Sequence, residues 1–210
     1  ANLFKDTNVQ KIKFSSNNNF SFNFNKNLKF DNFKVESSID LNQLVFNEKN
    51  FKLKSYLPSF IEEIKLEEHK IIINYNKNAL NIKGSGNILL EDKLDNLSYE
   101  IVKDNNDFLF NSKINIKNNS LLIDFLDYEK KGGLSSSVIL KGIYKENNQL
   151  RFDLINFKEK NNEILIKDLD LNQNFKIIDI ENFNINYKNN KKFFNKLNLK
   201  KNNSNFIIEG

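Results

Sequence analysis

The sequence predicts an all-β protein, a long antiparallel meander that curls into a half-pipe or taco-like groove with a continuous apolar inner face. The main observation is alternation: between Phe108 and Ile116, apolar residues such as Phe110 and Ile114 share one parity, and polar residues such as Lys113 share the other. Successive side chains of a strand point to opposite faces, so this segment has one apolar and one polar face. The pattern recurs along the chain between asparagine-rich polar turns, which is typical of an antiparallel sheet. A single proline in 210 residues also favours long, uninterrupted strands.

The length of the chain, 210 residues, allows one domain with its own core, and no linker or change of composition divides it. We therefore expect a single β-rich unit over residues 1–210. The spacing of the alternating runs predicts about 14 to 18 strands. The sequence contains no methionine, not even at position 1, and we expect it to be an internal piece of a longer polypeptide.

Residues 1–50 carry short apolar alternations separated by polar residues. Phe20 and Phe22 share one parity, and the parity changes near Asn32, which predicts a β-bulge. The run 17–19 consists of asparagine alone and predicts a turn.

One segment departs from the β pattern. Leu57, Phe60 and Ile64 recur at helical spacing, and Pro58 stands where a helix begins and its missing N–H does no harm. We expect one short helix near residues 58–64, packed on the sheet or capping it.

From Leu80 onward the alternation continues to the end of the chain. Gly84, Gly86 and Gly142 fall on the apolar parity, where a glycine marks a bend or a close approach of another group. The later alternating runs are 150–154, 164–166, 169–171, 175–180, 183–187, 197–199 and 206–208.

The composition argues against an enzyme and against a nucleic-acid-binding protein. The formal net charge is +5, but Arg151 is the only arginine, whereas proteins that read phosphates and base edges use arginine extensively. The absence of cysteine excludes disulfides and thiolate metal sites. No nucleophile triad, phosphate loop or zinc-ligand spacing occurs, and His69 and the pair Gly132–Gly133 are both expected in turns. We expect no catalytic residue, no metal and no cofactor.

The apolar parity has two interpretations that periodicity leaves open. In a closed barrel or a two-sheet sandwich these side chains form an ordinary core. In an open, rolled sheet they line a trough able to hold acyl chains. The candidate lining residues are Ile82, Ile88, Leu90, Tyr99, Ile101, Phe108, Phe110, Ile114, Ile116, Ile123, Phe125, Leu140, Phe152 and Leu154.

A resemblance favours the trough. A strand that ends in Tyr128-x-Lys130 before a glycine pair, followed by an amphipathic hairpin and a late strand closing on Ile208-Glu209-Gly210, resembles the AsmA-like family. The resemblance covers roughly residues 55–210, and its clearest segments are 121–133, 150–157, 164–171 and 202–210.

The resemblance implies a bacterial periplasmic segment that shields phospholipid acyl chains in a β-groove between the inner and the outer membrane. Its partners would be those acyl chains and the inner membrane, reached through an N-terminal anchor, with no nucleic acid involved. Neither a signal peptide nor an apolar run of about 20 residues occurs in this sequence, so we expect any anchor to lie outside it. The alternative function is an extracellular β-solenoid of the adhesin or passenger type, and an outer-membrane barrel ranks third.

Overall fold

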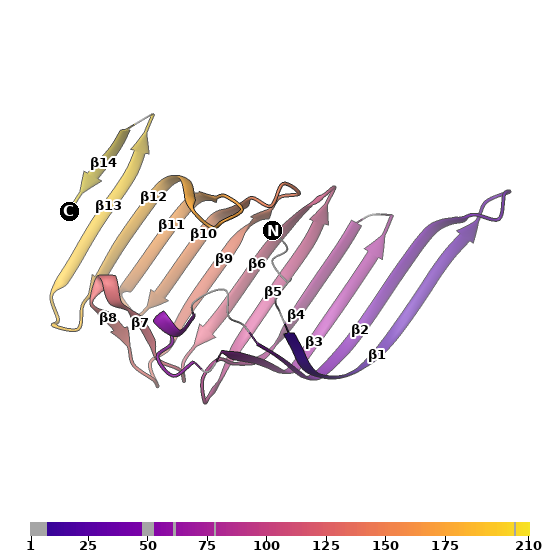
Figure 1. Ribbon diagram of the computed structural model, residues 1–210, viewed down its shortest axis with the longest axis horizontal. Coiled ribbons are helices and arrows are strands. Elements are labelled where there is room, and N and C mark those ends of the chain that lie inside the picture. Colours follow the sequence, from indigo (N-terminus) through magenta and orange to yellow (C-terminus); the bar gives the residue numbers. More distant parts are fainter. Residues whose placement is uncertain (1–7, 48–52, 61, 78, 204) are drawn as a thin grey trace.

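The computed structural model of the chain describes residues 8–47, 53–60, 62–77, 79–203 and 205–210. Twelve strands of these residues build one antiparallel sheet that is not closed into a barrel, and two further strands pair with each other (Figure 1). The predicted all-β meander is therefore confirmed. Every neighbouring pair of strands is antiparallel, whereas a β-solenoid stacks its strands in parallel.

The strands of the large sheet lie side by side in chain order, with β7 and β8 skipped between β6 and β9. Their bounds are β1 (Asn8–Phe24), β2 (Phe30–Asn47), β3 (Glu63–Asn76), β4 (Ala79–Leu89), β5 (Leu94–Asp104), β6 (Asp107–Ile116), β9 (Ser136–Tyr144), β10 (Leu150–Glu159), β11 (Asn162–Leu171), β12 (Ile177–Lys188), β13 (Phe194–Asn202) and β14 (Asn205–Glu209). The small sheet and the two 3-10 turns are β7 (Leu121–Ile123), β8 (Tyr128–Lys130), η1 (Leu53–Ser55) and η2 (Asp124–Leu126).

One face of the large sheet, here called the inner face, is apolar across most of its strands. Paired residues of neighbouring antiparallel strands point to the same face, so the register identifies the members of each face. One row of paired residues crosses eight strands from β3 to β12: Ile73, Ile82, Ile101, Phe110, Gly142, Phe152, Leu169 and Ile180. The opposite, outer face carries many polar residues, and one row on it runs through Lys83, Glu100, Asn111 and Lys141, although a neighbouring row contains Val102, Leu109 and Ile143.

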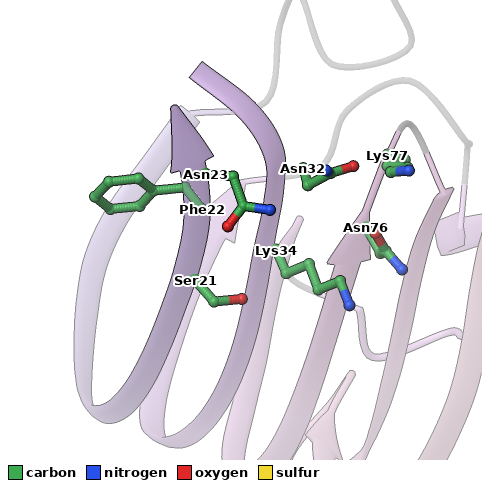
Figure 2. Close-up of a pocket in the computed structure, with 7 residues that line it drawn as sticks. All are labelled: Ser21, Phe22, Asn23, Asn32, Lys34, Asn76 and Lys77. Carbon is green, nitrogen blue, oxygen red and sulfur yellow. The ribbon is translucent and has the colours of Figure 1, made fainter. Parts of the chain in front are cut away.

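Bulges in neighbouring strands fall in register and bend the sheet. Phe14, Leu41 and His69 pair across β1, β2 and β3, and a register shift accompanies this row at Phe14 and again at His69. Glu68, beside His69, has a φ of 54°. Because bulges bend a strand and increase its twist, this end of the sheet is strongly curved, and Figure 2 shows its ribbons bent into a U. The bulge predicted near Asn32 is also confirmed by a register shift and a φ of 54°.

Two connections, residues 53–60 and 117–135, fold over the inner face along one rim, and we call them together the plug. The first buries Phe60 against the sheet, in a cluster with Leu57, Ile64, Ile88 and Leu90. The second buries Tyr128, in a cluster with Ile123, Phe157, Ile185 and Tyr187. The plug therefore gives the sheet two small hydrophobic cores on the same face.

The helix expected near residues 58–64 is wrong. Residues 58 and 59 form a turn, and Ile64 already belongs to β3. Glu62 between them has a φ of 62°, a left-handed conformation that a right-handed helix does not contain. Ile61 lies outside the described residues. The helical spacing of the apolar side chains reflects their burial in one cluster rather than a helix.

Of the two turns predicted at residues 17–19 and at Gly132–Gly133, the first is wrong and the second is confirmed. The asparagine run 17–19 is not a turn, because it lies in the middle of β1 and pairs with residues 36–38 of β2. The turn expected at Gly132–Gly133 is confirmed.

Candidate functional site

Beyond the plug, the inner face is an apolar surface that no second sheet covers among the described residues, and we call this surface the trough. The trough extends from the plug to the opposite rim, which we call the hairpin rim because the β1–β2, β3–β4, β5–β6, β9–β10 and β11–β12 hairpins turn there (Figure 1). Among the described residues, the plug is the only second layer over the sheet. Trough side chains such as Ile82, Ile101 and Phe110 are half-buried, whereas Ile88 and Ile116 beside the plug are only 6% and 4% exposed.

Three glycines on the inner face make room for aromatic rings. A Cβ placed on Gly84 would lie 2.3 Å from the Tyr99 ring, and one on Gly142 would lie 2.8 Å from Cζ of Phe110. Gly86 is equally close to the imidazole of His69. The close approaches predicted from these glycines are therefore present, and they let the rings lie low on the inner face. Phe110 also meets Phe152 edge to face, with 5.6 Å between ring centroids.

His69 is the one histidine and is not in a turn. It lies in β3 with 1% of its surface exposed, and its Nε2 is 2.9 Å from the carbonyl oxygen of Asn87. Its Nδ1 is buried and has no hydrogen-bond partner among the described residues. Burial lowers the pKa of His69, because a charged ring would lose its hydration there. The ring packs beside Tyr99, at 6.1 Å between centroids, and no carboxylate shares a hydrogen bond with it in the described part of the chain.

Polar groups fasten the plug to the sheet. Lys130 is fully buried, and its Nζ donates hydrogen bonds to the carbonyl oxygens of Lys117 at 3.0 Å and Asn119 at 2.5 Å. Burial lowers the pKa of Lys130, while the charges of Asp95, Glu159 and Glu91 oppose that shift. The plug thus contains a cation that is held by backbone carbonyls and surrounded by buried acidic residues.

All three of those acidic residues bind the plug directly, and Glu91 does so by accepting a hydrogen bond from the backbone N–H of Ser59 at 2.7 Å. Asp95 of β5 accepts hydrogen bonds from the backbone N–H groups of Lys117 at 2.8 Å and Asn118 at 2.9 Å. Tyr128 donates its hydroxyl to Glu159 of β10 at 2.9 Å, and burial together with this contact raises the pKa of Tyr128. Since these bonds join the plug to strands in both halves of the sheet, the plug is an integral part of the fold.

Seven of the predicted lining residues lie in the open part of the inner face, namely Ile82, Tyr99, Ile101, Phe108, Phe110, Leu140 and Phe152. Four others share that face but lie beside or beneath the plug, namely Ile88, Leu90, Ile114 and Ile116. The second group contributes to a closed core.

Three predicted lining residues are elsewhere. Phe125 is in η2 and is 76% exposed, and Ile123 belongs to the plug itself. Leu154 pairs with Lys141, on the outer face, because β10 contains an extra residue between Phe152 and Leu154. Alternation predicts the face of a residue only up to the next bulge, and here the bulge reverses it.

The sequence prediction also missed members of the trough. Ile73, Leu169 and Ile180 complete the inner-face row that contains Phe110. The alternation within their own strands indicated that these residues lie on an apolar face. The pairing register is needed to show that they lie in the same row as Phe110.

The outer face has shallow, polar depressions. The one drawn in Figure 2 has a volume of about 410 Å³ and is lined by Ser21, Phe22, Asn23, Asn32, Lys34, Asn76 and Lys77. Figure 2 shows Phe22 pointing to the opposite side of β1 from Ser21 and Asn23. Amide and ammonium groups dominate this surface, so it is no site for an apolar ligand.

Comparison with protein-family models, curated proteins and solved structures found no match for this chain. The resemblance to the AsmA-like family therefore stays a prediction. Among the described residues, no helix has the length and apolar character that crossing a membrane requires. Within the same residues, no group of three or more histidine, aspartate or glutamate side chains is arranged to hold a metal ion.

Proposed function

We propose that the trough shields the acyl chains of phospholipids from water during their transfer. The observation that supports this proposal is the apolar row that crosses eight strands of a sheet that is not closed into a barrel; Leu169 of the row is buried, and its other large side chains are half-buried. At about 4.8 Å between neighbouring strands, the row extends for roughly 34 Å. The hydrocarbon core of a bilayer is about 30 Å thick, and the acyl chains of one leaflet fill about half of it. The row is therefore longer than the distance that an acyl chain spans in its leaflet.

Transfer along such a surface requires no catalytic residue. Each methylene group kept from water is worth about 0.8 kcal/mol, and the free energy changes little as a chain slides along a uniformly apolar row. The head group would stay at the open side, near the polar residues of the hairpin rim such as Lys103 and Asn148. The protein would then act as a passive conduit.

The resemblance to the AsmA-like family suggests where in the cell this transfer would take place. In that setting the chain is a segment of a longer periplasmic protein, anchored to the inner membrane, and phospholipid moves along it towards the outer membrane.

A charge in the trough should obstruct the acyl chain. We expect Phe110→Asp to reduce co-purified phospholipid at least tenfold, because an unpaired carboxylate against an acyl chain costs several kcal/mol. The measurement is mass spectrometry of lipid extracted from the purified protein, together with binding of a fluorescent phospholipid. Ile116→Asp is unsuitable, since Ile116 is buried beside the plug and the charge would unfold the chain.

Leu109→Asp is the matched control. Leu109 is the neighbour of Phe110 in β6, but it points to the outer face and is 38% exposed. This variant should keep wild-type lipid binding. Equal lipid binding by both variants, with both folded by circular dichroism, would show that the inner face is only an unusual core.

A further inference from the structure

The tip of the β1–β2 hairpin is an exposed apolar surface at one end of the sheet. Phe22, Phe24 and Leu28 are 46%, 56% and 81% exposed, and the hairpin protrudes at the hairpin rim (Figure 1). Phe22 and Phe24 meet edge to face at 5.5 Å between centroids. A soluble β-protein ordinarily keeps such residues out of its hairpin tips, so this cluster requires an explanation.

The turn itself does not account for Leu28. The same five-residue turn closes four hairpins, and in each the fourth residue donates its N–H to the first and has a positive φ. These fourth residues are Leu28, Asn148, Phe175 and Lys192. Asparagine and glycine tolerate that left-handed conformation, whereas a leucine resists it. Leu28 therefore occupies a backbone position that disfavours it, with its side chain in water.

Basic side chains lie near this apolar tip. Lys26 and Lys29 flank Leu28 and are exposed, and Lys34 and Lys77 line the adjacent polar depression. Figure 2 shows that Lys34 and Phe22 point to different sides of the hairpin. Asp31 is the one acidic residue between Lys26 and Lys34. The tip thus combines apolar residues with a local excess of positive charge.

We propose that this hairpin tip docks on the surface of a bilayer that contains anionic lipids. Leu28 and Phe24 enter the boundary between head groups and acyl chains, and the lysines bind lipid phosphates, as in other interfacial anchors. The inference rests on the proposed function, because docking at the end of the sheet would place a membrane beside the trough. The charge of the tip selects an anionic bilayer over a neutral one.

The test is flotation of the 210-residue chain with vesicles of phosphatidylcholine, with or without phosphatidylglycerol. We expect binding to the vesicles with phosphatidylglycerol, weakening as salt is raised, and little binding to phosphatidylcholine alone. Leu28→Asn should lower the partition coefficient about tenfold, since burial of a leucine is worth roughly one to two factors of ten. Asparagine suits the left-handed position, so this variant should fold at least as stably as the wild type.

Phe193→Ser is the control for non-specific binding of vesicles by an exposed aromatic residue. Phe193 is 65% exposed beside Lys191 and Lys192, but it lies in the β12–β13 turn at the rim opposite the hairpin rim. This variant should float like the wild type. Equal flotation of Leu28→Asn and the wild type, or equal binding to neutral vesicles, would overturn the proposal.

Two further readouts separate the remaining outcomes. Leu28→Asn should still bind a monomeric fluorescent fatty acid in the trough. The two proposals can therefore fail separately: fatty-acid binding without vesicle docking would contradict only the docking proposal, and vesicle docking without fatty-acid binding would contradict only the proposed function. If light scattering shows a dimer that Leu28→Asn dissociates, the tip covers a second copy of the chain and the membrane proposal is wrong.

Discussion

The single histidine lies where a neutral ring is stabilised and a charged ring is not. His69 donates from Nε2 to the Asn87 carbonyl, and its Nδ1 faces no hydrogen-bond partner among the described residues. Gly86 leaves space for the imidazole, and Tyr99 packs beside it. Protonation would place a second N–H and a charge in an apolar site, which destabilises the folded state.

Stability should therefore depend on pH through His69. Its pKa in the folded protein is below the ordinary value of 6.5, so the unfolded chain binds the proton more readily. The stabilisation is complete above a pH of about 6.5 and is lost as the pH falls, by up to about 1.4 kcal/mol per pH unit, until the folded pKa is reached. Urea unfolding across this range measures it.

His69→Phe isolates this contribution, because it keeps a ring against Gly86 and removes the titrating group. The free energy of unfolding of the variant should change less between about pH 7 and about pH 5 than that of the wild type. Identical pH profiles would mean that His69 is not the residue responsible.

At the scale of elements, the plug depends on one buried cation. Lys130→Met should destabilise the protein by about 1–3 kcal/mol, because it removes the ammonium donor of the Asn119 carbonyl oxygen and one of two donors of the Lys117 carbonyl oxygen, which also accepts from the N–H of Gly133. The loss should begin in the plug, since in the described part of the chain β7 and β8 pair with each other and are not strands of the large sheet. Hydrogen exchange should show residues 117–135 opening more often, with little change in β1 and β14 at the two edges of the large sheet.

Lys131→Met is the comparison variant, because Lys131 is the next residue and is exposed. We expect it to change stability by less than about 0.5 kcal/mol. Equal losses in the two variants would contradict the role given to the buried ammonium group.

The elements also show how far periodicity predicts this fold. Alternation predicted the strands of the meander and the bulge at Asn32, because period-2 burial is a direct consequence of a one-sided sheet. It failed at Phe125, where the run leaves β7 for a 3-10 turn, and at Leu154, where a bulge reverses the parity. It also failed at residues 58–64, since contact at a spacing of three and four residues occurs in compact turns as well as in helices.

At the scale of the whole molecule, the open trough could not be predicted from the residue pattern. A sandwich core and an uncovered trough require the same apolar alternation, and the difference lies in whether a second layer exists. Here the connections at 53–60 and 117–135 supply that layer along one rim only. Their covering role depends on contacts with distant strands, which local spacing does not encode.

Pairing in chain order determines how the sheet folds and how it opens locally. Except where 117–135 is bypassed between β6 and β9, each strand of the sheet adds directly to the strand before it. Loops that close a hairpin are short and entropically cheap, so the contact order is low for a β-protein and growth can start from any central hairpin. Amide protection should therefore decline in steps from β4–β6 towards β1 and β14, because the strands at the two edges of the sheet open more often than the central ones. Uniform protection from edge to edge would show that the sheet unfolds as one cooperative unit instead.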